Sequence, residues 1–158
     1  MICACERILD ERRREMLRNP ALKPTDPRSL ESANNLVRIA TDKGFTSGKW
    51  LLLVQPRHME AVWRIISKAT EKGDLGFASK KKLGPKVHNM LSICVYIRDF
   101  TDHSELRRVL LKLKELLPKD TGPPVVFAGF KPDVFTALGL YGGNQWKLEV
   151  TIHKEMCK

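Results

Sequence analysis

The sequence lacks the features that mark secreted proteins, membrane-spanning proteins and proteins stabilised by a structural metal ion. Its four cysteines have neither the paired spacing of a zinc site nor the density of a disulfide framework. Charged residues interrupt the N-terminus from Glu6 onward, and no apolar run approaches the ~20 residues that a membrane helix needs. These absences predict a soluble protein without a membrane span, located in the cytoplasm or, alternatively, in the nucleus.

Signatures of catalysis are also lacking. The sequence has no G-x-x-x-x-G-K-[ST] or G-x-G-x-x-G run, and GLYGGN (139–144) lacks the strand-to-helix context of a phosphate loop. The histidines are isolated from one another, and Asp102, three residues after Asp99, is better explained as a helix cap than as a general acid or base. The sequence therefore favours a non-enzymatic protein, with no catalytic residue, no metal and no cofactor.

What remains is an ordinary globular composition with a strong excess of positive charge. The 158 residues are 42% hydrophobic and 29% charged, which is enough for one self-sufficient core. Lys and Arg number 28 against 18 Asp and Glu, a net charge of +10 that favours polyanions such as RNA. The densest positive patch is Lys80, Lys81, Lys82 and Lys86, for which the alternative interpretation is a solvated loop.

Apolar spacing predicts helices at residues 5–17, 27–42, 56–73 and 102–117. Asp26 and Asp102 are the expected N-caps of two of them. The short apolar or β-branched runs 49–54, 91–100, 123–130 and 144–153 predict strands, whereas the glycine- and lysine-rich stretch 73–87 predicts a loop or an irregular edge. The pattern indicates an α/β chain of the α+β kind, with an N-terminal helical extension (1–45) and a core domain (46–158).

Four short motifs in order along the chain resemble the family of basophilic leukemia-expressed proteins. They are GKW (48–50), DFTD (99–102), KPD (131–133) and GNQW (143–146), and the resemblance spans about residues 47–153. It leaves the N-terminal 45 residues outside. No reaction is established for that family, so the resemblance implies architecture and only a hint of RNA binding.

The family is similar in fold to translation initiation factor 4E. The resemblance therefore implies a curved, mainly antiparallel sheet with long helices across its convex side. Cap binding by that factor uses two aromatic rings, but Trp50 and Trp63 are expected in the core here, which leaves only Trp146 as a candidate ring. We therefore do not transfer cap binding to this chain.

Residues of the family-like motifs supply the remaining binding candidates, because sheet packing alone does not explain their polar groups. Their alternative role is to stabilise turns through side-chain hydrogen bonds. These candidates are Lys49, Lys131, Asp133, Tyr141, Asn144 and Trp146.

The leading hypothesis is a binding protein for RNA or another phosphate-rich ligand. One alternative is a protein-interaction adaptor that docks a partner on its helical face. A further alternative is a small-molecule enzyme or sensor with a pocket around Lys131, Asp133, Tyr141 and Trp146.

Overall fold

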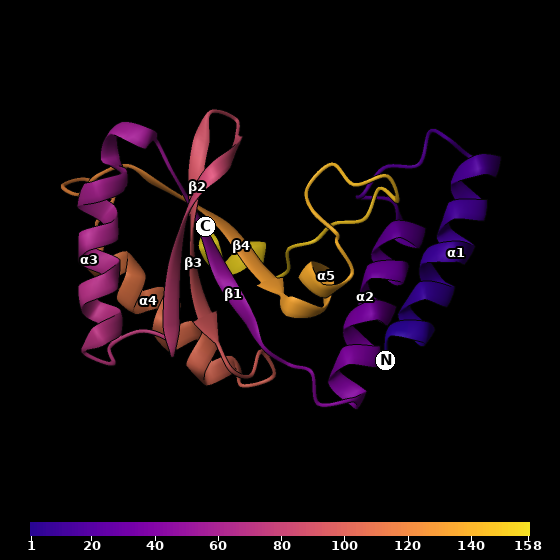
Figure 1. The fold of residues 1–158 in the computed structure, drawn as a ribbon, viewed down its shortest axis with the longest axis horizontal. Coiled ribbons are helices and arrows are strands. Elements are labelled where there is room, and N and C mark those ends of the chain that lie inside the picture. The colour runs from indigo at the N-terminus through magenta and orange to yellow at the C-terminus, as the bar shows by residue number, and fades with distance from the viewer. The chain divides into compact units, whose positions relative to one another are not determined.

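A computed structural model of the chain describes all 158 residues, apart from the side chains of Pro85 and Val87. It confirms the α+β class, with five α-helices and a four-stranded sheet (Figure 1). The helices are α1 (Ile2–Arg18), α2 (Pro27–Asp42), α3 (Met59–Glu71), α4 (His103–Leu116) and α5 (Asp133–Ala137). The strands are β1 (Gly48–Val54), β2 (Ala78–Val87), β3 (Met90–Ile97) and β4 (Val125–Pro132), and the 3₁₀ turns are η1 (Pro56–His58) and η2 (Lys154–Cys157).

The chain divides into two compact units. One comprises residues 1–46 and 132–152, and the other comprises residues 47–131 and 153–158. The first crossing between the units lies close to the predicted boundary at residue 45, but residues 132–152 share a unit with the N-terminal helices rather than with the sheet. The division into an N-terminal extension and a core domain stays a prediction.

The sheet unit contains an open sheet in the order β2-β3-β1-β4. The β2–β3 and β1–β3 pairs are antiparallel, and α3 and α4 lie on the same face of the sheet (Figure 1). Trp50 anchors this face, because its indole Nε1 donates to the carbonyl of Leu106 in α4 (3.2 Å) and its ring packs edge-on against Phe130 (5.3 Å). The likeness to the initiation factor fold stays a prediction.

Two predicted helix starts differ in their capping. Asp102 caps α4 as expected, since its Oδ1 accepts from the backbone N–H of Glu105 (3.1 Å). Asp26 occupies the N-cap of α2 without a side-chain cap bond, and its carboxylate accepts instead from the N–H of Lys23. Among the described residues, none of the helices combines the length and hydrophobicity needed to cross a membrane.

The lysine-rich stretch expected to be a loop or an irregular edge forms the edge strand β2. The expectation of a loop was therefore wrong, although the irregularity is present as a register shift between Lys82 and Val87. His88 and Asn89 connect β2 to β3 with positive φ angles of 49° and 63°, the backbone of a two-residue hairpin turn whose twist matches the strands. Pairing with β3 therefore keeps this stretch extended, although its glycine and proline content disfavours a strand.

The strand predicted over residues 144–153 is wrong, because the segment is irregular apart from an isolated bridge at Ile152. Asn144 closes a loop by donating to the carbonyl of Leu148 and accepting from its N–H (2.8 and 3.1 Å). Lys147 has a φ of 51°, which an extended strand does not allow. Local side-chain bonding therefore replaces a sheet ladder here.

The helical unit packs α1, α2, α5 and the loop after α5 around its own apolar core. Arg12 ties these segments together, and its side chain is 0% exposed. Its Nε donates to the carbonyl of Trp146 (2.9 Å), Nη1 donates to the carboxylate of Glu15 (3.1 Å), and Nη2 donates to Ser29 Oγ in α2. The core comprises Cys5, Leu9, Ala33, Leu36, Ala40, Val134, Phe135, Leu140, Leu148 and Val150.

Replacing Arg12 by Met is expected to lower the free energy of unfolding by roughly 3 kcal/mol, because one buried and two part-buried acceptors lose their donor. The matched control is Arg13→Met, since Arg13 and its partner Asp10 are 60% and 58% exposed and 3.6 Å apart. That control is expected to change stability by no more than ~0.5 kcal/mol. Urea denaturation followed by circular dichroism measures both, and equal losses would contradict the role given to Arg12.

Candidate functional site

Strand register separates the two faces of the sheet. On one face Trp50 pairs with Val95 and Leu52 pairs with Ile93, and this face packs against the helices. The alternate residues point to the opposite face, where Lys49 lies beside Tyr96. A polar and basic face thus lies back to back with the apolar core of the sheet unit.

Strand β2 extends this second face with two lysines. Lys80 pairs with Cys94 and Lys82 pairs with Ser92 in the β2–β3 ladder. Phe130 packs on Trp50 on the helix side, so its neighbour Lys131 in β4 points to the opposite side. We call this surface the lysine face, and it comprises Lys49, Lys80, Lys82, Ser92, Cys94, Tyr96 and Lys131.

Burial on the lysine face changes from the inner strands to the edge. Lys49 and Lys131 are 3% and 5% exposed and Cys94 is fully buried, whereas Lys82 is half-buried and Lys80 is exposed. The ammonium of Lys49 lies over the ring of Tyr96, 5.6 Å from its centroid, an arrangement in which the ring quadrupole stabilises the cation. The edge strand therefore carries the accessible part of this face.

The thiol of Cys94 lies within the electrostatic influence of several lysines. Burial raises its pKa, while the nearby charges of Lys82, Lys49 and Lys131 oppose this and lower it. Burial is the larger effect, so the thiol is held in its protonated form. Three ammonium groups from three strands thus act electrostatically on a single side chain.

The predicted lysine cluster does not lie on one face. Lys81 pairs with Ile93 in the ladder and points to the helix side, where its Nζ is 2.9 Å from the Glu60 carboxylate and 5.8 Å from the Trp63 ring centroid. Trp63 is accordingly half-buried, and its expected place in the core was wrong. Lys86 is exposed near the hairpin turn.

An aromatic cluster adjoins the lysine face where β2 begins. The ring of Phe77, which is 48% exposed, lies 6.2 Å from the ring of Tyr96. The guanidinium of Arg98 sits over the same Phe77 ring, 4.5 Å from its centroid. These two side chains line a pocket of about 350 Å³ together with Leu75, Ile97 and the start of α4.

The basic residues of α4 do not add to the lysine face. Arg108 binds the Glu105 carboxylate through two nitrogens (2.8 and 2.7 Å) and the carbonyls of Asp74 and Leu75. Lys112 pairs with Glu115, and Lys114 donates to the carbonyl of Met156. These three cations have protein partners, whereas Arg107 is exposed; the helix that carries all four lies across the other face of the sheet.

The other predicted site residues belong to the helical unit. Asp133 is the first residue of α5, and Tyr141 is exposed. Asn144 also donates to the Tyr141 carbonyl (2.8 Å) and thus has the turn-stabilising role given above as its alternative. Trp146 packs against the apolar core, and its buried Nε1 has no hydrogen-bond partner among the described residues. A role of these four residues in binding stays a prediction.

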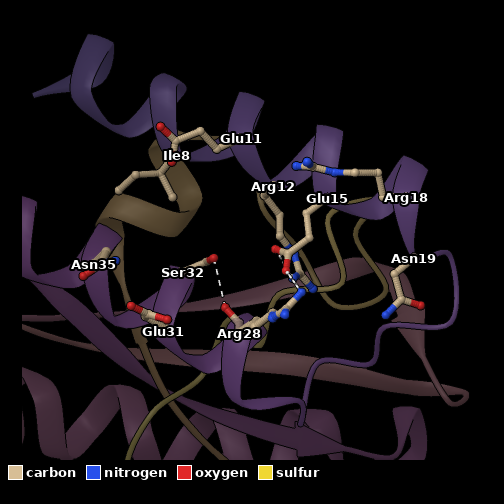
Figure 2. A pocket seen from close by; sticks show the side chains of 10 residues that line it. All are labelled: Ile8, Glu11, Arg12, Glu15, Arg18, Asn19, Arg28, Glu31, Ser32 and Asn35. Carbon is tan, nitrogen blue, oxygen red and sulfur yellow. Dashed lines mark hydrogen bonds and ion pairs between the residues drawn. The ribbon is translucent and has the colours of Figure 1, made fainter.

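A groove of about 650 Å³ lies between α1 and α2 in the helical unit (Figure 2). Figure 2 shows the side chains of Arg12, Glu15 and Arg28 meeting in it, and the two Glu15 oxygens lie 3.1 Å from Arg12 and 3.1 Å from Arg28. Opposite charges therefore already neutralise one another in this groove.

The histidines, cysteines and carboxylates are dispersed over the described residues. Within them, no group of three or more His, Cys, Asp or Glu side chains is arranged to hold a metal ion. All four cysteines are free thiols. His103 and His153 stack edge to face at 5.6 Å, and His153 Nδ1 lies 3.6 Å from Glu155.

Sequence analysis missed two features of the sites, although the sequence contains a pattern for each. Ser92, Cys94 and Tyr96 alternate with apolar residues in β3, which marks a face of its own. Arg12 follows Leu9 at helical spacing on the buried side of α1, so its position distinguishes it from the neighbouring Arg13.

Cysteine labelling tests the burial of the lysine face. Cys3 is exposed, whereas Cys94 is fully buried with a raised pKa, so an alkylating reagent is expected to modify Cys3 in the native protein and to spare Cys94. All four thiols are expected to react in urea, which serves as the control. Mass spectrometry of the peptides locates the label, and equal labelling of both cysteines in the native state would contradict this burial.

The family comparison supports the resemblance inferred from the motifs, but the family match covers different residues. A family model described as basophilic leukemia-expressed protein Bles03 matches residues 10–139. The match includes α2 and most of α1, so the expectation that the first 45 residues lie outside the family was wrong, and it ends before the GNQW motif. Because the match covers more than half of the chain, this protein belongs to the Bles03 family of basophilic leukemia-expressed proteins.

Proposed function

We propose that the protein is a non-enzymatic binding protein that holds RNA through the edge of its lysine face. The observation that carries the proposal is a set of unpaired cations on one strand. Among the described residues, no carboxylate forms an ion pair with Lys80, Lys82 or Lys86, although Lys81 between them is paired with Glu60. Unpaired cations are free to replace the counterions of a phosphate backbone.

The spacing of the edge lysines also suits a chain of phosphates. Lys80 and Lys82 are alternate residues of a strand, so their side chains leave the same face about 7 Å apart. A net charge of +10 assists the approach of any polyanion.

Salt-dependent RNA binding tests the proposal. The wild-type protein is expected to bind a short single-stranded RNA tightly at low salt and weakly at high salt, as measured by fluorescence anisotropy. Lys80→Gln/Lys82→Gln is expected to weaken binding and to reduce the slope of log K against log salt by about 1.4, since two phosphate contacts are lost.

Lys81→Gln is the control on the helix side of the same strand, and it removes one positive charge where the double variant removes two. Its salt slope is expected to equal that of the wild type. Absence of binding at low salt would refute RNA binding, and a slope reduced by about 0.7 in Lys81→Gln, half the change of the double variant, would show that only net charge matters.

A second candidate function, a protein-interaction adaptor, is supported by apolar side chains exposed on the first two helices. Leu17 and Ile2 in α1 are 79% and 50% exposed, and Leu30 in α2 is 44% exposed. Ile2 and Leu17 stand at opposite ends of α1, about 22 Å apart, so they do not form one contiguous patch and support this function less than the lysines support RNA binding.

A partner bound through these residues is expected to stay bound after nuclease treatment and at high salt, in contrast to RNA. Leu17→Asp is expected to release it, and Leu111→Asp, at a 58% exposed leucine of α4, is the control. Affinity purification with quantitative mass spectrometry measures both. Retention of the same proteins by Leu17→Asp would count against the adaptor role.

The small-molecule enzyme or sensor has the least support. Lys131, Asp133, Tyr141 and Trp146, the residues it requires around one pocket, line neither of the two described pockets.

A further inference from the structure

We propose that Phe77 and Arg98 form a stacking platform for an unpaired base of the bound nucleic acid. This inference rests on the proposed function, and it adds the class of ligand: a single strand with accessible bases, rather than a duplex or a chain of phosphates. The platform lies beside the lysine face, so phosphates and a base are recognised by neighbouring parts of the same unit.

The geometry of the platform distinguishes it from ordinary surface side chains. Phe77 is a large aromatic residue with 48% of its surface exposed, and the guanidinium of Arg98 is centred 4.5 Å above its ring. Among the described residues, Arg98 has no ion pair with a carboxylate. Aromatic rings and guanidinium planes are the two groups on which proteins stack unpaired bases.

The pocket beside the platform has an apolar floor and a polar rim. Leu75 and Ile97 are 3% and 2% exposed and form its apolar part, and its polar part combines the carboxylates of Asp99, Asp102 and Glu105 with the guanidinium groups of Arg98 and Arg108. Its volume of about 350 Å³ lies at the lower end of the range for small-ligand pockets. A planar base that stacks on the platform would therefore find an apolar surface below and hydrogen-bonding groups at its edge.

The support beneath the platform is fixed before a ligand arrives. Arg108 bonds the carbonyls of Asp74 and Leu75 at 3.0 and 3.1 Å, and Glu105 holds its guanidinium from the other side. Gly76 lies so close to β3 that a Cβ there would be 1.8 Å from the carbonyl oxygen of Tyr96. The backbone before Phe77 is thereby held against β3, which limits the ordering that binding requires.

The platform is connected to the lysine face through Tyr96. The rings of Phe77 and Tyr96 are 6.2 Å apart, and the ammonium of Lys49 lies over Tyr96. The series Arg98, Phe77, Tyr96, Lys49 thus places two neighbouring rings between two cations, from the exposed rim to the buried interior. Lys80, three residues after Phe77 in the chain, places an unpaired cation about 10 Å farther along the same strand.

Two probes with different chemistry test the platform: a short single-stranded RNA, and inorganic polyphosphate, which has the charges but no bases. Phe77→Ala is expected to weaken RNA binding roughly 5- to 100-fold, the range for loss of one stacked base. It is expected to leave the salt slope and the affinity for polyphosphate unchanged, because no phosphate contact is removed. Phe77→Trp is expected to restore RNA binding.

The control variant is Leu111→Ala, which removes an exposed apolar side chain from α4 and is expected to change neither affinity. RNA binding that Phe77→Ala leaves unchanged would overturn the platform and leave the proposed function intact. A loss of polyphosphate binding in Phe77→Ala would also overturn it, since the ring would then act on the fold. If the wild type binds neither probe at low salt, the proposed function fails, and the platform fails with it.

Discussion

The candidate site depends on the register between β1 and β3. A shift of one residue would exchange the two faces of β1 and bring Lys49 into the layer that Trp50 now fills. The cost of burying an ammonium against α4 without a partner is far larger than the gain from any contact that the shifted register offers. The tryptophan core therefore determines where the lysines lie, and the site is a consequence of packing on the opposite face.

Lysines on an edge strand have a second physical role that competes with the functional one. A row of charges at the sheet edge prevents pairing with another strand, and proteins commonly protect edges in this way. This role explains the four lysines of β2 equally well whichever face they occupy. It does not explain the exposed ring of Phe77 under Arg98, which is the observation that supports the proposed ligand beside edge protection.

The predictable parts of the fold are those that local patterns determine. Strand β1 and helices α2 and α4 were predictable, because an apolar run between glycine and proline, or an apolar stripe behind a cap, allows few alternatives. Strand β2 was not, because its glycines and lysines oppose a strand and only pairing with β3 overrides them. The segment 144–153 has strand-like composition, yet the Asn144 side chain bonds and the positive φ of Lys147 prevent an extended ladder.

The residue types of the candidate site were predictable from the sequence, but the face of the sheet on which each side chain lies was not. The sequence identifies the lysines, yet alternation along β2 places Lys81 against Glu60 and only Lys80 and Lys82 beside Cys94. The same distinction applies to the arginines. Arg12 is buried with all its bonding to the helical unit, Arg108 is held by Glu105 and two carbonyls, and Arg98 has a ring as its neighbour. The net charge therefore overstates the number of cations available to a ligand, because the cations that organise the fold are already bonded to protein groups.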